Sequence, residues 1–248
     1  MIDAGNAALL AAAGLGAGAV NAVAGGGSLI SFPALLAAGY PSITANVTNS
    51  IAVLPGYIGG SVAYRRELGG QAGRIRALAL TSALGAAIGA ALLLVSSASV
   101  FDAIVPWLIL AACGLLAVQP RVAALARERR AHSPPMLHAC VFAATVYGGY
   151  FGAGLGIMLL AILGVFVDDH LQRLNALKGV LSLLVAAVAA VGFALFGPVA
   201  WDATAIIGVT CLAGGALGVS VARRLSAAVL RGAVIAYGVV VALVLLVS

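Results

Sequence analysis

The stretch that decides the fold covers residues 14–60 and reads GLGAGAVNAVAGGGSLISFPALLAAGYPSITANVTNSIAVLPGYIGG. It is apolar enough for a lipid bilayer, yet glycines cluster at Gly25 to Gly27 and prolines follow at Pro33 and Pro41. Inside a helix, each glycine costs about 1 kcal/mol and each proline about 3 kcal/mol relative to alanine. Something other than the stability of one continuous spanning helix must therefore explain this stretch.

Composition places the chain in a membrane. Of its 248 residues, 63% are hydrophobic and only 8% are charged, and the mean hydropathy is +1.17. A soluble domain of this composition would expose a hydrophobic exterior to water. The long apolar runs favour spanning helices of about 20 residues, and the short alternating segments of a β-barrel are not found. We therefore predict an all-α polytopic membrane protein.

The charged residues and cysteines exclude several other functions. The net charge is +6, but the basic residues lie in loops between apolar segments, as membrane topology requires, so we expect no nucleic-acid partner. Cys113, Cys140 and Cys211 match no metal-ligand or disulfide spacing. No histidine lies inside a plausible spanning helix to act as the base of a serine hydrolase. We expect no cofactor and no enzymatic activity.

Apolar runs between charge clusters predict eight segments. They cover residues 4–39, 42–64, 77–96, 102–120, 136–167, 171–197, 203–222 and 228–247. The first and fifth, of about 36 and 32 residues, are too long for one untilted crossing and too short for two crossings with a turn. Glycines interrupt both of these long segments, at Gly25 to Gly27 and at Gly152 to Gly156.

An internal repeat relates the two long segments. A shift of 129 residues places Gly25 on Gly154, Gly27 on Gly156 and Asn46 on Asn175 without a gap. The same shift also pairs Leu54 with Leu183, Thr81 with Thr210, Gly85 with Gly214 and Gly89 with Gly218. Because asparagine is scarce in this chain, the coincidences indicate a duplication.

Charge predicts how the two halves cross the membrane. The 13 basic residues fall into four loops, near residues 65–76, 121–130, 173–178 and 223–231. If the fifth segment enters and leaves at one face, all four loops lie on one side of the membrane. The fifth segment is then a helical hairpin, and the repeat extends this prediction to the first segment.

Each half then contains one re-entrant hairpin and three crossings, an odd number, so the two halves have inverted topology. Residues 1–120 form the first half, 121–135 a cytoplasmic linker and 136–248 the second half of one membrane domain. The basic loops would face the cytoplasm, and both termini would lie outside the inner membrane. Charge leaves open whether the first segment turns back or crosses fully, because the Tyr40-Pro41 connection is uncharged.

Two hairpin tips that meet near the midplane would form a site for a small anion. Non-helical backbone at this depth needs polar partners, and amide groups at helix N-termini favour anions. The expected substrate contacts at the tips are Gly25, Gly26, Gly27, Ser28, Gly154 and Gly156. The alternative is a packing role, which we expect for Gly85, Gly89 and their repeat partners.

Polar residues near the starts of the second and sixth segments are further candidates for substrate binding. They are Asn46, Thr48, Asn49, Asn175 and Lys178. Amides and hydroxyls donate hydrogen bonds to oxyanions, and Lys178, which replaces Asn49 in the repeat, would supply a positive charge. Lys178 lies about 12 Å into its helix, near the midplane of a ~30 Å core. Two alternatives stay open: the lysine could extend back to the membrane surface, and the asparagines could join helices.

A set of short motifs spans nearly the whole chain: Gly18, Gly25 to Ser28, Phe32-Pro33, Gly39 to Pro41, Asn46 to Ser50 and a degenerate copy at residues 148–156. With these motifs the chain resembles the TauE/SafE family, also called the sulfite exporter or toluene-sulfonate uptake permease family. The resemblance implies an inner-membrane carrier for sulfite or small organosulfonates such as sulfoacetate, often an exporter, with proton coupling.

Alternating access around an anion held between the hairpin tips is the resulting hypothesis. Three alternative functions stay open: an anion channel, a carrier for a non-sulfur anion such as a carboxylate, and a structural membrane subunit. The expected partners are the small anion and the lipid bilayer, and the oligomeric state, including a homodimer, is left open.

Overall fold

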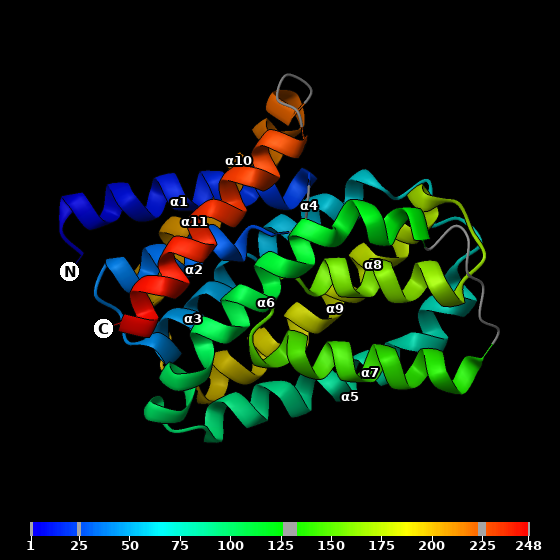
Figure 1. Cartoon of the computed structure of the whole chain (residues 1–248), viewed down its shortest axis with the longest axis horizontal. Helices are drawn as coiled ribbons and strands as arrows, with labels where there is room; N and C mark the ends of the chain where they lie inside the picture. The colour runs from blue at the N-terminus through cyan, green and yellow to red at the C-terminus, as the bar shows by residue number, and fades with distance from the viewer. Residues whose placement is uncertain (1, 24–25, 126–132, 223–226, 248) are drawn as a thin grey trace.

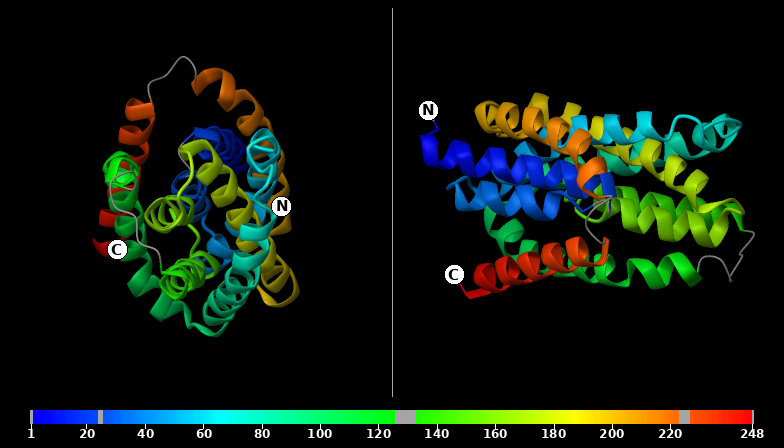
Figure 2. Two further views of the ribbon diagram at one scale, coloured as in Figure 1. Left: turned by 90° about the vertical axis from the view of Figure 1, so that its right-hand side faces the viewer. Right: turned by 90° about the horizontal axis from the view of Figure 1, so that it is seen from above.

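The computed structural model describes residues 2–23, 26–125, 133–222 and 227–247. Within these ranges the chain forms helices joined by short connections and has no strand, which confirms the predicted all-α class. Figures 1 and 2 show most helices running along the long axis of the molecule. The helices are α1 (Ala4–Val23), α2 (Ser28–Ala37), α3 (Ser42–Ala52), α4 (Leu54–Ala63), α5 (Ala72–Val95), α6 (Ala98–Leu125), α7 (Pro134–Tyr150), α8 (Leu155–Phe166), α9 (Leu171–Phe196), α10 (Trp201–Ala222) and α11 (Ala227–Val247).

Three helices in the described part are long and apolar enough to cross a membrane, judged by length and composition. They are Ala72–Val95, Ala98–Val118 and Leu171–Phe196, which correspond to α5, most of α6, and α9. Shorter apolar helices lie at Ser28–Ala37, Leu155–Phe166 and Arg231–Val247.

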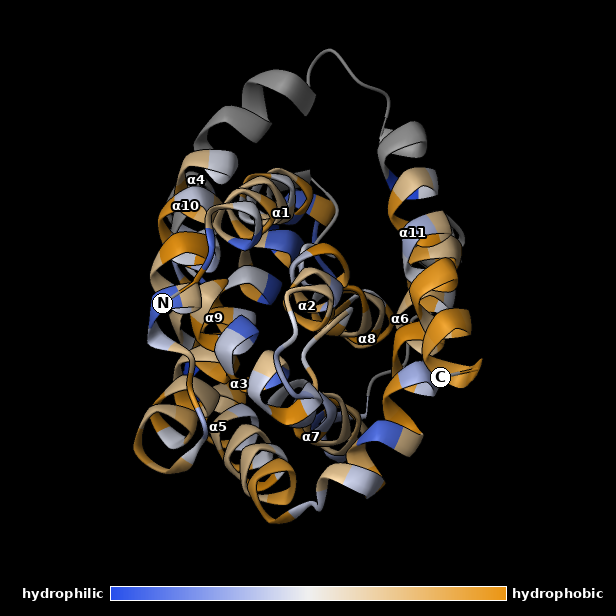
Figure 3. Ribbon diagram, turned by 90° about the vertical axis from the view of Figure 1, so that its left-hand side faces the viewer, coloured by the Kyte–Doolittle hydropathy of each residue, from blue (hydrophilic) through white to orange (hydrophobic). Residues whose placement is uncertain are grey.

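Large hydrophobic side chains cover the outside of the molecule, and several polar side chains are buried among the hydrophobic ones inside it. On α5, Leu80 and Val95 expose 68% and 80% of their surface, whereas Asn46 and Asn49 of α3 are buried. Figure 3 shows hydrophobic residues along the outward-facing helices α5, α6 and α11. Water disfavours this arrangement and lipid accepts it, as expected for a multi-pass membrane protein.

Two pairs of helices turn back in the middle of the molecule. The outer ends of α1 and α2 lie at the left of Figure 1, whereas those of α7 and α8 lie at the right. The ten residues of α2 and the twelve of α8 extend about 15 Å and 18 Å, roughly half of a ~30 Å hydrocarbon core. Each pair therefore places its turn near the middle of the long axis of the molecule.

A proline divides the second predicted segment, residues 42–64, into two helices. α3 ends at Ala52 and α4 begins at Leu54, immediately before Pro55. Proline lacks the N–H that would continue the helical ladder and its ring crowds the preceding turn. The position 129 residues later is Leu184, and α9 continues through it without a break.

Glycines let two pairs of helices pack with their backbones in close contact. α1 packs along α10, and α5 packs along α7. A methyl group added at Gly89 would lie 2.0 Å from the backbone oxygen of Val146, and one at Gly214 would lie 2.1 Å from that of Leu15. The same applies at Gly85, so the predicted packing role is confirmed at these three glycines. The surroundings of Gly218 lie outside the described side chains.

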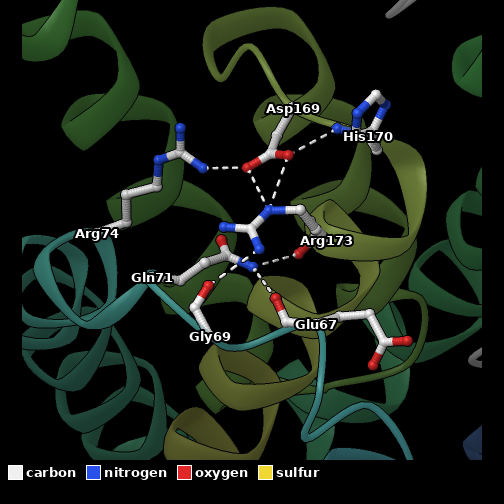
Figure 4. Close-up of polar contacts among 7 residues, drawn as sticks. All are labelled: Glu67, Gly69, Gln71, Arg74, Asp169, His170 and Arg173. Carbon is white, nitrogen blue, oxygen red and sulfur yellow. Dashed lines mark hydrogen bonds and ion pairs between the residues drawn. The ribbon is translucent and has the colours of Figure 1, made fainter.

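An ion-pair cluster joins the α4–α5 connection to the start of α9. Figure 4 shows Asp169 between the guanidinium groups of Arg74 and Arg173, and Arg173 Nε donates to the carboxylate at 2.9 Å. Hydrogen bonds from both arginines and from the His170 N–H lower the pKa of Asp169 to about 2, outweighing the opposing effect of desolvation. Arg173 also donates to the Gly69 oxygen at 3.0 Å. Ion pairs and a hydrogen bond to the backbone therefore both connect the start of α9 to the α4–α5 region.

The predicted linker, residues 121–135, overlaps the end of α6. α6 continues through Leu125, so the first five residues of the predicted linker 121–135 are helical. Residues 126–132 lie outside the described part, and α7 begins at Pro134. The predicted boundary at residue 120 therefore falls inside a helix.

Candidate functional site

The first turn, between α1 and α2, is shaped by a close backbone contact. A methyl group at Gly27 would lie 2.3 Å from the Ala17 oxygen, so only glycine fits there. The Gly27 N–H donates to Asn21 Oδ1 at 2.9 Å, and this amide is therefore occupied rather than free for an anion. Gly26 packs beside Leu116 of α6, and the predicted contact Gly25 lies outside the described residues.

The second turn, between α7 and α8, uses glycine for its conformation. Gly152 and Gly154 both have φ of +81°, a left-handed geometry that residues with a Cβ rarely adopt. Tyr147 fastens the turn, because its hydroxyl donates to the Ala153 oxygen at 2.6 Å. The chain can then reverse and begin α8 at Leu155.

A small cavity touches both turns. Its volume is about 20 Å³, room for about one water molecule. Ser28 reaches it from the first turn, and Phe151 and Gly152 reach it from the second. Its other polar lining residues are Ser50 of α3, Tyr57 of α4 and Ser182 of α9. The Ser182 hydroxyl is buried and has no hydrogen-bond partner among the described residues, so this cavity offers an unused donor.

The predicted polar residues of α3 join helices to one another. Asn46 Nδ2 donates to the Tyr150 oxygen at the end of α7 at 2.9 Å, while its buried Oδ1 has no partner. Asn49 Oδ1 accepts a 2.5 Å hydrogen bond from Ser31 of α2. Thr48 Oγ1 accepts from the Ala200 N–H at 3.0 Å, in the connection before α10. Thr48 therefore holds a loop in place and does not face either turn.

Lys178 of α9 lies over the start of α8. Its Cδ, Cε and Nζ atoms would each be 3.7–3.8 Å from a methyl group added at Gly156, so the whole distal side chain covers this glycine. The side chain is partly buried. Asn175, one turn earlier on α9, is partly buried, and no hydrogen bond in the described part joins it to either turn.

Positive charge therefore gathers at the second turn without a counterion. In the described part of the chain, both ion pairs involve Asp169, and no carboxylate lies within ion-pair distance of Lys178. The first-turn N–H groups of Gly156 and Ser28 form no hydrogen bond to the described residues. A lysine beside the positive end of a helix is unfavourable by itself and favourable with an anion between them.

The structure thus groups some predicted residues and separates others. Gly156 and Lys178 meet directly, and Ser28 opens on the cavity. Ser182 lies one turn after Lys178 on the same face of α9, and it is not among the predicted substrate contacts. The predicted contacts also omit Asn21 and Tyr57, although a lone amide four residues before the cluster Gly25 to Gly27 is a usable signal.

These features define a class: a helical multi-pass membrane protein whose interior holds a polar, cationic site between two helix breaks. The sequence profile of the family described as "Sulfite exporter TauE/SafE" matches residues 10–245. The chain belongs to this family, as the motifs suggested, and the family is one of membrane transporters.

Several curated proteins are similar along most of the chain. "Probable membrane transporter protein ORF9" of Sinorhizobium sp is 28% identical over 237 residues, covering 93% of this chain and 88% of that protein. "Probable membrane transporter protein" of Haemophilus influenzae is 26% identical, covering 88% and 84% of the two chains. "Probable membrane transporter protein YfcA" of Escherichia coli K12 is 28% identical, covering 84% and 76%. No solved structure gives a significant match.

Proposed function

We propose that this protein is a secondary transporter that moves small sulfur-containing anions across the inner membrane by alternating access. The direction we propose is export, coupled to protons. The observation that carries the proposal is the position of Lys178, whose ammonium group lies over Gly156 at the first turn of α8, with no carboxylate of the described residues within ion-pair distance.

The proposed binding site lies between the two turns. Lys178 and the N–H of Gly156 supply positive charge, and the hydroxyls of Ser28 and Ser182 supply donors along the adjoining cavity. Asn49 and Asn175 would complete it, with Asn46 and Gly154 holding the turn. An oxyanion that accepts several of these hydrogen bonds would offset the cost of a charge at this depth.

The sulfur specificity rests on the family rather than on the site. The donors would serve sulfite, a sulfonate such as sulfoacetate, or a carboxylate, because each offers anionic oxygens. The family description names sulfite export, and for this reason we propose sulfur anions first and a carboxylate as the alternative.

Inverted repeats would provide the movement. We propose that residues 1–120 and 136–248 are two inverted halves that rock against each other. In support, each long hairpin arm packs against the other half, α1 on α10 and α7 on α5. Both termini lie at one end of the molecule, which we assign to the outside, and the Arg74 and Arg173 end to the cytoplasm.

The cavity size favours a carrier over an open channel. At about 20 Å³ it holds about one water, whereas sulfite has four heavy atoms. An anion would therefore enter only after the helices around the cavity move, which is the behaviour of a carrier. A channel, the alternative, would need no such step for each ion.

Counterflow in proteoliposomes tests this function. Purified protein is loaded with unlabelled sulfite, sulfoacetate, isethionate or a carboxylate such as acetate, and uptake of the labelled anion is followed. We expect saturable counterflow of at least one sulfur anion that exceeds the carboxylate. Flux that shows no counterflow but gives single-channel currents would establish the channel instead, and an acetate preference would overturn the substrate class.

A further inference from the structure

Lys178 is the only lysine in the chain, since the other twelve basic residues are arginines. The described arginines lie near helix ends or in loops, and two of them are paired with Asp169. Arginine stays charged at any physiological pH, whereas a lysine in a desolvated site readily gives up its proton. In the described part of the chain, the basic side chain that lies against a helix break is therefore a lysine, which can become neutral.

Without a bound anion, the positive charge of Lys178 would have no negative group beside it. The Lys178 side chain lies along Gly156, the residue after the cavity-lining Leu155, and forms no ion pair or hydrogen bond in the described part. The α8 N-terminus adds further positive potential. Breaking a buried ion pair by removing one partner is strongly unfavourable, because the remaining charge is uncompensated. Loss of the anion should therefore be followed by loss of the proton.

The neighbouring helices provide no substitute for the anion. α9 packs against α3, α4, α5, α7 and α8, and neither α3 nor α8 carries a charged or titratable side chain. The groups on the other elements, including the α4–α5 connection, are Tyr57, Tyr64, Arg65, Arg66, Glu67, Arg74, Arg76, His138, Cys140, Tyr147 and Tyr150, with Arg173 on α9 itself. None of them bonds to Lys178.

We infer that Lys178 carries the proton that travels with the anion: its amine is protonated while an anion is bound and neutral while the site is empty. This inference rests on the proposed function. Anion binding and protonation then favour each other by linkage, and the loaded and empty carriers both reorient without a net charge at the midplane. A monovalent anion would move with one proton in the same direction.

The single lysine allows a direct measurement on the full chain. Protein labelled with ¹⁵N at lysine Nζ has one side-chain amine signal, whose shift reports protonation. Titrations are run in nanodiscs with chloride, with sulfite and with isethionate, a sulfonate that stays ionised. We expect an exchanged anion to move the midpoint to higher pH by at least one unit relative to chloride. A midpoint that is the same in all three salts would overturn the inference.

Transport by a Lys178→Arg variant gives the second test. With the membrane potential clamped at zero and the outside of the vesicles more acidic than the inside, the wild-type protein should accumulate isethionate about tenfold per pH unit of the gradient. The permanently charged arginine should retain counterflow and lose this accumulation. If the variant still accumulates with the pH gradient, Lys178 is not the proton carrier. If the wild-type protein exchanges none of the tested anions, the proposed function itself fails, which is a different result from exchange without coupling.

Discussion

Asn46 of α3 donates a hydrogen bond from Nδ2 to the backbone oxygen of Tyr150, the last residue of α7, at 2.9 Å. Because α3 belongs to the first half of the chain and α7 to the second, this bond holds the second turn against the other half. The turn carries Gly152 and Gly154, both in left-handed geometry, so its position depends on such contacts. The candidate site is thus assembled from both halves of the sequence.

Replacing Asn46 by leucine should loosen the second turn. The variant leaves the Tyr150 oxygen without its partner, and we expect a loss of about 0.5–2 kcal/mol, the range for hydrogen bonds between membrane helices. Thermal unfolding of the purified protein in detergent measures this loss. As a control, Thr204→Val removes a hydroxyl that bonds only to Ala200 within its own turn, and its melting temperature should change less. Equal losses in the two variants would contradict a special role for Asn46.

Replacing Gly89 by alanine should separate α5 from α7. The added methyl group would lie 2.0 Å from the Val146 oxygen, so the helices must move apart, at a cost of about 1–3 kcal/mol. The matched control is Gly73→Ala at the start of the same helix, where a methyl group meets nothing within 4 Å. We expect the control to be neutral or slightly stabilising. The measurement compares the melting temperatures of the two variants in detergent. A Gly89→Ala protein as stable as the Gly73→Ala control would refute the close contact.

Replacing Ser182 by alanine should weaken transport without weakening the fold. The Ser182 hydroxyl is buried, unpartnered and part of the cavity lining, so its removal costs no internal hydrogen bond. If it donates to the anion, the KM for transport should rise about tenfold or more, from the 1.5–3 kcal/mol of a hydrogen bond to a charged group. Ser82→Ala is the matched control, because Ser82 is also buried and unpartnered but does not line the cavity. The same KM in both variants would remove Ser182 from the site.

Replacing Asp169 by asparagine should destabilise the end of the molecule that carries Arg74 and Arg173. The carboxylate receives hydrogen bonds from both arginines, which hold its pKa near 2, below the value of about 3.9 in an unfolded chain. A lowered pKa in the folded state means that this stabilisation is present above about pH 4 and is lost as the pH falls towards 2.

We therefore expect the Asp169→Asn protein to melt lower than wild type at pH 7, with the difference shrinking on acidification below about pH 4. A double-mutant cycle with Arg74→Gln isolates the ion pair, and its coupling should vanish over the same range. A melting difference that is independent of pH would show that the carboxylate charge is not what holds this end together.

Much of the architecture follows from local patterns in the sequence. The apolar runs predicted the helices, since lipid requires long apolar stretches and satisfied backbone groups. The glycine clusters predicted both interruptions, and the shift of 129 residues predicted that they correspond. The packing roles of Gly85, Gly89 and Gly214 also followed, because small residues in membrane helices usually mark close contacts.

The sequence by itself determined the class of protein, the two breaks and the residue types available to hold an anion, since these depend on composition and spacing. Tertiary structure decided which of those residues meet. In the folded protein, the Gly27 N–H donates to Asn21, Thr48 accepts from the Ala200 N–H, and the Lys178 side chain lies over Gly156. Only Thr48 and Ala200 are far apart in the chain, but all three contacts depend on how separate segments pack, and no periodicity within one helix encodes the partner that a polar side chain will find.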